Sequence, residues 1–144
     1  MPRSTSLNPL SDLTRVEDYL EVIYGLIQEK GYARSVDIAE LLQIKAASVT
    51  GMLQRLHEME LIVYERYRGL TLTAKGERLA RDVQQRHLII LKFLRVLGIG
   101  DKVAREDAEG IEHHVHKITI ERIRNLVQYA DEHPSWVQAF VERS

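Results

Sequence analysis

The stretch from Val36 to Leu56 constrains the fold of this chain more than any other part of its sequence. A short segment whose apolar residues have helical spacing, DIAELL, is separated by a turn at residues 43–45 from a longer segment, ASVTGMLQRL. The apolar residues of the longer segment would share one face of a helix: Val49, Met52, Leu53 and Leu56. Two short helices joined by a tight turn are typical of a helix-turn-helix.

The residues after this motif predict a small β-hairpin. Two segments with strand character, 61–65 and 70–73, flank the sequence Arg66-Tyr67-Arg68-Gly69. A helix-turn-helix followed by a hairpin is a winged helix-turn-helix, whose second helix enters the major groove of DNA. Residues 45–92 favour this interpretation because they hold nine basic and five acidic side chains, a net charge of +4, whereas the whole chain has a net charge of −1.

The outward positions of the second helix and the tip of the hairpin carry the candidate DNA contacts. Hydroxyl, amide and guanidinium groups at these positions can hydrogen-bond to base edges or to phosphates. Small residues at the start of the helix allow close approach to the groove. The predicted contacts are Lys45, Ala47, Ser48, Thr50, Gln54, Arg55, Arg66 and Arg68. The alternative is a helical hairpin that packs without any role in DNA binding.

Further helices are predicted around this motif from apolar periodicity and capping residues. Thr14 with Glu17 and Ser135 with Gln138 have the spacing of capping boxes, and Thr73 is a candidate N-cap. The predicted helices cover residues 14–30, 74–98, 101–116, 119–133 and 135 onward.

The fold class is therefore mainly α: an N-terminal winged helix-turn-helix with a small β-hairpin wing, followed by a C-terminal helical domain. Residues 1–13 contain two prolines and several small polar residues, and are predicted to be a flexible tail. The predicted division is a tail over 1–13, a DNA-binding domain over 14–73, and a linker helix with a helical domain over 74–144.

The segment Glu109-Gly110-Ile111-Glu112-His113 predicts a metal site. The chain has no cysteine, so any metal must be held by oxygen and imidazole. On a helix, positions i, i+3 and i+4 lie on one face, so Glu109, Glu112 and His113 would project together. Such hard donors suit manganese or ferrous iron. The alternative is a solvated surface cluster.

Two other helices offer further candidate ligands. Asp18 and Glu21 have the same three-residue spacing on the first predicted helix, and His87 lies midway along the long helix, where its neighbours become apolar. Both features also have an interpretation without metal, because a carboxylate pair usually forms a solvated face of a helix and a histidine beside apolar residues usually belongs to the core. Four carboxylates at one site would repel one another unless divalent cations compensated their charge.

Enzymatic, membrane and exported proteins fit the sequence poorly. It lacks His-Glu-x-x-His, and Glu109 stands where the inverted form of that motif needs its first histidine. No nucleophile or acid–base pair is evident apart from the proposed ligands, so an enzyme is not expected. No apolar run could span a membrane or serve as a signal peptide, which predicts a cytoplasmic protein.

Over residues 15–132 the chain resembles the manganese-responsive branch of the diphtheria-toxin-repressor family. The stretches that carry the resemblance are VEDYLEVIYGLIQEKGYARSVDIAELL, SVTGMLQRLHEMELIVYERYRGLTLTAKG, DAEGIEHHV and NLVQYADE. The resemblance implies a homodimeric repressor that binds double-stranded operator DNA, with a C-terminal helical dimerisation domain. It also implies a pair of Mn²⁺ ions per subunit. The implied ligands are Asp18, Glu21, His87, Glu109, Glu112 and His113, with the Glu109 carbonyl as a further donor.

The resemblance also bears on the choice of metal. The iron-responsive branch has Met where this chain has Asp18 and Cys where it has Glu109, so two hard oxygens replace two sulfurs. This favours Mn²⁺, although Fe²⁺, Co²⁺, Zn²⁺ or Cd²⁺ would also be accepted. The expected function is repression of metal-uptake genes, with metal stabilising the DNA-binding arrangement of the dimer. The alternative is a winged-helix regulator that senses ferrous iron or a non-metal signal.

Overall fold

The computed structural model describes residues 9–65 and 69–143. The chain divides into two compact units, unit 1 from Met1 to Asp82 and unit 2 from Val83 to Ser144, and each is described by itself. Within the described residues, no helix combines the length and the apolar character that crossing a membrane would require.

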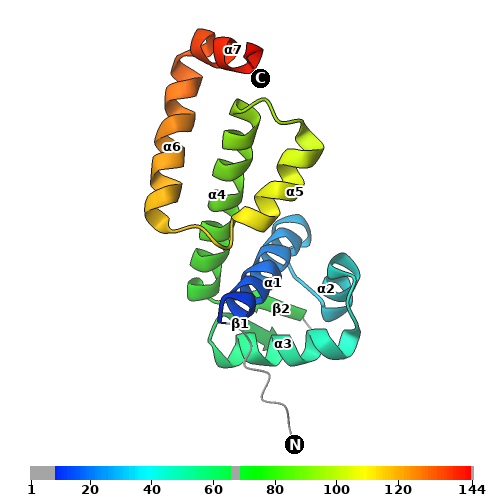
Figure 1. The fold of residues 1–144 in the computed structure, drawn as a ribbon. Helices are drawn as coiled ribbons and strands as arrows, with labels where there is room; N and C mark the ends of the chain where they lie inside the picture. Colours follow the sequence, from blue (N-terminus) through cyan, green and yellow to red (C-terminus); the bar gives the residue numbers. More distant parts are fainter. Residues whose placement is uncertain (1–8, 66–68, 144) are drawn as a thin grey trace, which may run out of the picture. The chain divides into compact units, whose positions relative to one another are not determined.

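Unit 1 contains three helices, a two-stranded sheet and the start of a fourth helix (Figure 1). The elements are α1 (Pro9–Lys30), α2 (Ser35–Leu42), α3 (Ala46–Glu58), β1 (Ile62–Glu65), β2 (Gly69–Leu72) and α4 (Ala74–Val96). The boundary between the units falls inside α4. The order of two short helices and a hairpin confirms the predicted winged helix-turn-helix.

The core of unit 1 is built around the apolar stripe of α1. Leu20 and Ile23 are fully buried and belong to one cluster with Ile38 of α2 and Leu56 of α3. The strands pair antiparallel, with Ile62 opposite Leu72 and Glu65 opposite Gly69. Burial of this shared apolar surface fixes α3 against the other elements and leaves its opposite side exposed to solvent.

The junction between α3, β1 and α4 is closely packed. The Thr73 hydroxyl accepts a hydrogen bond from the Gly76 amide at 3.0 Å and donates one to the Glu60 carbonyl at 2.6 Å. Thr73 is therefore the N-cap of α4, as predicted. A Cβ atom at Gly76 would lie 1.9 Å from the Leu61 carbonyl oxygen, so only glycine allows this approach.

Unit 2 contains the second part of α4 with three more helices, α5 (Asp101–Ile111), α6 (Lys117–Glu132) and α7 (Pro134–Glu142). Its core joins Ile90 and Leu94 of α4 with Ala104 and Ala108 of α5 and with Ile120 of α6. The small alanines let α5 pack closely against α4.

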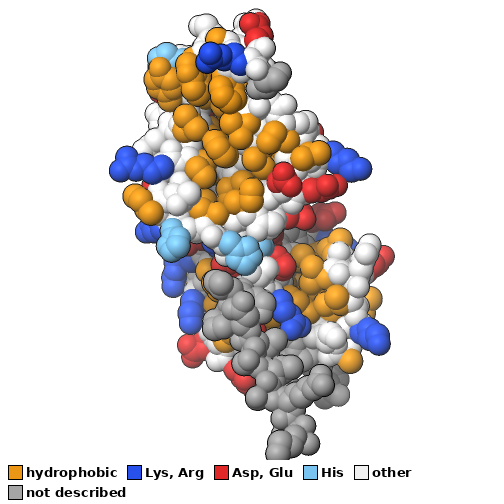
Figure 2. Space-filling view, in the orientation of Figure 1, with side chains coloured by type: hydrophobic (Ala, Val, Ile, Leu, Met, Phe, Trp, Pro, Cys, Tyr) orange, Lys and Arg blue, Asp and Glu red, His pale blue; other side chains and the backbone are white. Residues whose placement is uncertain are grey.

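Hydrophobic side chains also gather on the surface of unit 2 (Figure 2). Along α6 and α7, the residues Tyr129, Trp136 and Phe140 are 46%, 40% and 38% exposed. The Tyr129 and Trp136 rings meet edge to face with centroids 5.6 Å apart, and the Trp136 and Phe140 rings stack at 6.2 Å. So large an exposed aromatic surface is typical of an interface with another chain.

Several predicted boundaries are wrong. α1 begins at Pro9 rather than at Thr14, so residues 9–13 belong to the helix and Thr14 is not its N-cap. The reason is that Asp12, in the first turn of α1, pairs with Arg55 of α3. The earlier tail residues, 1–8, lie outside the described part of the chain.

Differences also occur in unit 2. α5 ends at Ile111 instead of near His116, and Glu112 is its C-cap. The Glu112 carbonyl accepts a hydrogen bond from Arg86 of α4 at 3.1 Å, which satisfies it without a further helical turn. α6 begins at Lys117, before the predicted cap at Thr119.

The capping box predicted at the start of α7 does not form. Pro134 occupies its first turn, where a missing amide proton costs nothing, and no side chain caps the helix. Gln138 donates instead to Glu142, one turn further along.

Candidate metal centre and nucleic-acid interface

The exposed side of α3 carries most of the predicted DNA contacts. Ala47, Ser48, Thr50 and Gln54 are all exposed, and Lys45 is exposed as the N-cap residue before the helix. Thr50 donates its hydroxyl proton to the Ala46 carbonyl at 3.1 Å, so toward a ligand this hydroxyl acts as an acceptor. Arg66 and Arg68, predicted at the wing, lie outside the described residues.

Arg55 is engaged within the protein. Its guanidinium donates to the Asp12 carboxylate of α1 at 2.6 Å. This hydrogen bond lowers the pKa of Asp12 and raises the pKa of Arg55, so the pair is fully ionised at neutral pH. No local sequence pattern predicts this pair, because 43 residues separate its members.

Neutralising Asp12 is expected to strengthen DNA binding. In an Asp12→Asn variant, Arg55 keeps its charge but loses the carboxylate that it pairs with. The slope of DNA affinity against salt should therefore become steeper by about one counterion. The stability of the folded protein should change little, because both members of the pair are partly exposed. Binding to duplex DNA at several salt concentrations measures the effect.

The matched control is Asp37→Asn, which removes the same charge from unit 1 without touching Arg55. Equal salt slopes for the two variants would contradict a specific role for the Asp12–Arg55 pair.

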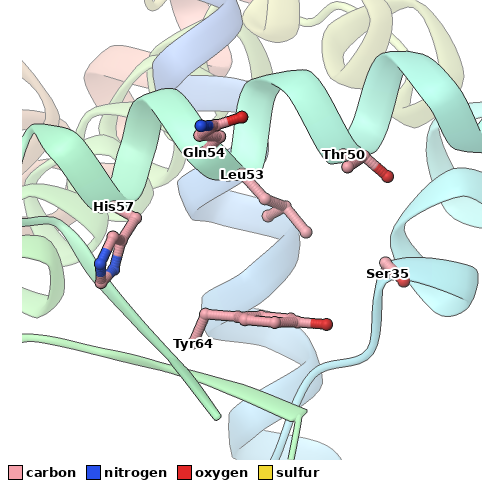
Figure 3. A pocket seen from close by; sticks show the side chains of 6 residues that line it. All are labelled: Ser35, Thr50, Leu53, Gln54, His57 and Tyr64. Carbon is pink, nitrogen blue, oxygen red and sulfur yellow. The ribbon is translucent and has the colours of Figure 1, made fainter. Parts of the chain in front are cut away.

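A pocket of about 280 Å³ lies beside the exposed side of α3 (Figure 3). Its lining comes from three elements: the start of α2, one flank of α3, and strand β1. The lining residues are Ser35, Thr50, Leu53, Gln54, His57 and Tyr64. The helix-turn-helix pattern points to Thr50 and Gln54 but not to Ser35, His57 or Tyr64, because each of these three is an ordinary polar residue in the sequence and only the fold brings them together.

In unit 2 the fold brings together three of the candidate metal ligands. The Glu112 carboxylate places Oε2 2.6 Å from Nδ1 of His87 and Oε1 3.3 Å from Nε2 of His113. Glu112 and His113 are 1% and 8% exposed. A buried carboxylate between two imidazoles forms a compact set of oxygen and nitrogen donors. His87 is supplied by α4, Glu112 is the C-cap of α5, and His113 is the residue after that cap.

The other candidate ligands lie on α5 and α1. Glu109 is exposed on α5, and since α5 ends at Ile111, His113 lies beyond the helix rather than on one helical face with Glu109 and Glu112. Asp18 and Glu21 lie on α1 of unit 1, where both are half-buried. Arg86 was missed by sequence analysis, and its bond to the Glu112 carbonyl holds the end of α5 against α4.

Two family models match the chain in succession. Residues 12–70 match the iron dependent repressor, N-terminal DNA binding domain, and residues 73–136 match the iron dependent repressor, metal binding and dimerisation domain. The chain belongs to the iron-dependent repressor family. In this repressor the winged helix-turn-helix thus corresponds to the DNA-binding domain, and the cluster of His87, Glu112 and His113 lies in the metal-binding one.

Individual relatives agree with the family models. The repressor is 50% identical over 117 residues to the HTH-type transcriptional regulator MntR of Shouchella clausii strain KSM-K16, covering 81% of this chain and 82% of that protein. Among solved structures it resembles the manganese regulator SloR, with a TM-score of 0.71 and 31% identity, and ScaR with bound Zn²⁺, with a TM-score of 0.67 and 32% identity. Each comparison covers 79% of this chain and 54% of the other, so the repressor spans about half the length of those two chains.

Proposed function

We propose that this chain is a manganese-responsive repressor that binds operator DNA as a homodimer. The observation that carries the proposal is the Glu112 carboxylate held between the imidazoles of His87 and His113. It is supported by 50% identity to a transcriptional regulator named MntR and by likeness to a structure described as a manganese regulator. Repression of metal-uptake genes is the corresponding biological role.

The donor set fits manganese. His87, Glu112 and His113 offer oxygen and imidazole donors, and the sequence contains no cysteine that would favour a softer metal. We assign Asp18, Glu21 and Glu109 to the same centre, on the strength of the family resemblance and of their carboxylate chemistry. The family resemblance implies two Mn²⁺ ions per subunit at this centre. Related structures with Zn²⁺ and Cd²⁺ support some tolerance for other divalent cations.

The mechanism follows from our assignment of ligands on α1 to the same centre as those on α4 and α5. A bound divalent cation supplies the positive charge that lets carboxylates of unit 1 and unit 2 share one centre without repulsion. Asp18 and Glu21 then restrain α1, and with it the domain that presents α3. In a dimer this restraint sets the spacing of the two recognition helices, and only one spacing matches two half-sites about one helical turn apart. The protein's own ligands thereby select the DNA-binding arrangement.

The homodimer is supported by unit 2. The exposed aromatic surface of Tyr129, Trp136 and Phe140 provides apolar area that a second copy can cover. Residues 73–136 match a model described as a metal binding and dimerisation domain.

The experiment that tests the proposal is a DNA titration with and without manganese. A duplex selected from a random-sequence library by the protein in MnCl₂ is titrated in MnCl₂ and in a chelator, and calorimetry measures manganese binding to the free protein. We expect about 5- to 150-fold tighter DNA binding with manganese, and an equal gain in manganese affinity when the duplex is present. Equal DNA affinity in both buffers would overturn the proposal.

A further inference from the structure

The geometry assigns a DNA-backbone site to the pocket between α2, α3 and β1: we infer that it receives one deoxyribose-phosphate unit of the strand that borders the major groove. This inference rests on the proposed function, because it names the part of the DNA that this surface recognises. The pocket has a volume of about 280 Å³ and lies entirely within unit 1.

The position of the pocket on α3 points to the backbone. The buried side of α3 carries Val49, Met52 and Leu56, and the opposite side carries Ala47 and Gly51. A helix with its side chains is about 10–12 Å across and the major groove is about 12 Å wide, so the flanks of an inserted helix meet the sugar–phosphate walls. Thr50 and His57 lie on one such flank, and both line the pocket.

The polar side chains of the pocket suit hydrogen bonding to a phosphate and contact with a sugar. Figure 3 shows the Tyr64 ring lying across the pocket from α3, with its hydroxyl directed toward the side where Ser35 lies. Among the described residues, no hydrogen bond engages the side chains of Ser35, Gln54, His57 or Tyr64, so their donors are available. Hydroxyl and amide groups of this kind make many of the phosphate contacts in protein–DNA complexes.

The apolar part of the pocket suits the sugar. Leu53 is 6% exposed and forms the inner wall, while Tyr64 is 55% exposed on strand β1. A deoxyribose placed between them would cover the Tyr64 ring and bring carbon atoms against Leu53. Among the described residues that line the pocket there is no lysine or arginine, so their contact with DNA should strengthen binding without releasing counterions.

The test compares Tyr64→Phe with Lys45→Ala in the manganese-loaded, full-length protein, bound to the library-selected duplex over a range of salt concentrations. We expect Tyr64→Phe to weaken binding about tenfold, which corresponds to ~1.4 kcal/mol, with an unchanged salt slope. Lys45→Ala should weaken binding and reduce the salt slope by about one, because it removes a charge. Thr119→Val, which removes an exposed hydroxyl from unit 2, is the matched control and should bind normally.

Phosphate ethylation locates the contact. Ethylation of one particular phosphate should weaken binding of the unmodified protein and have little further effect on Tyr64→Phe. Wild-type affinity for both Tyr64→Phe and Ser35→Ala would overturn the inference, as expected if the pocket instead holds a free small molecule. A reduced salt slope for Tyr64→Phe would also overturn it. These results are separable from the proposed function, because the ratio of affinities with and without manganese should be the same for Tyr64→Phe as for the unmodified protein.

Discussion

Glu112→Gln is expected to abolish the response of DNA binding to manganese while leaving the fold and the dimer intact. Glu112 contacts both His87 and His113 and is 1% exposed, so its carboxylate is the shared member of the cluster. Glutamine has nearly the same shape but lacks the negative charge and one of the two acceptor oxygens. Manganese affinity should fall by more than the 10- to 100-fold typical of changes outside the ligand shell.

The measurement pairs manganese calorimetry with DNA titration in manganese and in chelator. For Glu112→Gln, the ratio of the two DNA affinities should fall to about one. Glu106→Gln is the matched control, since Glu106 is an exposed glutamate of the same helix, α5, and it should respond to manganese normally. A Glu112→Gln variant with a full manganese response would remove Glu112 from the ligand set.

Gly76→Ala is expected to destabilise unit 1 by about 3 kcal/mol. The added methyl group would lie 1.9 Å from the Leu61 carbonyl oxygen, which is backbone and has little freedom to move. That carbonyl also accepts a hydrogen bond from the Thr73 amide at 3.1 Å, and the Gly76 amide donates to the Thr73 hydroxyl. The substitution therefore disturbs both the N-cap of α4 and the connection to β1.

Urea unfolding followed by far-UV circular dichroism measures this effect. Gly25→Ala is the matched control, because Gly25 lies inside α1 with nothing within 4 Å of an added Cβ atom. It should raise the stability by about 0.5–1 kcal/mol through the lower backbone entropy of alanine in the unfolded chain. A Gly76→Ala variant as stable as the unmodified protein would show that α4 can shift away from Leu61 at no cost.

Elements defined by local sequence could be predicted, and those defined by distant partners could not. The apolar spacing of Val49, Met52 and Leu56 was enough to place α3, and Thr73 was enough to place the start of α4. By contrast, the end of α5 depends on Arg86, which lies on α4, 26 residues before Glu112. No pattern within residues 101–116 contains that information.

The same distinction applies to the candidate sites. The prediction from the spacing of Glu109, Glu112 and His113 assumed a helix that continues through His113, whereas α5 ends at Ile111. The contact of Glu112 with His87 bridges 25 residues and arises from the packing of α5 on α4. The pocket beside α3 depends on Tyr64 of β1 and Ser35 of α2, and neither belongs to a motif.

Because α1 begins at Pro9, its first turn makes an additional contact with α3. Asp12 is bonded to α3, and Asp18 follows six residues later on the same helix, about 9 Å further along its axis. The same helix, α1, thus carries both the residue that is hydrogen-bonded to α3 and a carboxylate assigned to manganese. A protein shortened by the first turn of α1 would retain every assigned metal ligand but lose the Asp12–Arg55 hydrogen bond between α1 and α3. Purification tags or cleavage sites placed just before Asp12 should therefore be chosen so that this hydrogen bond is kept.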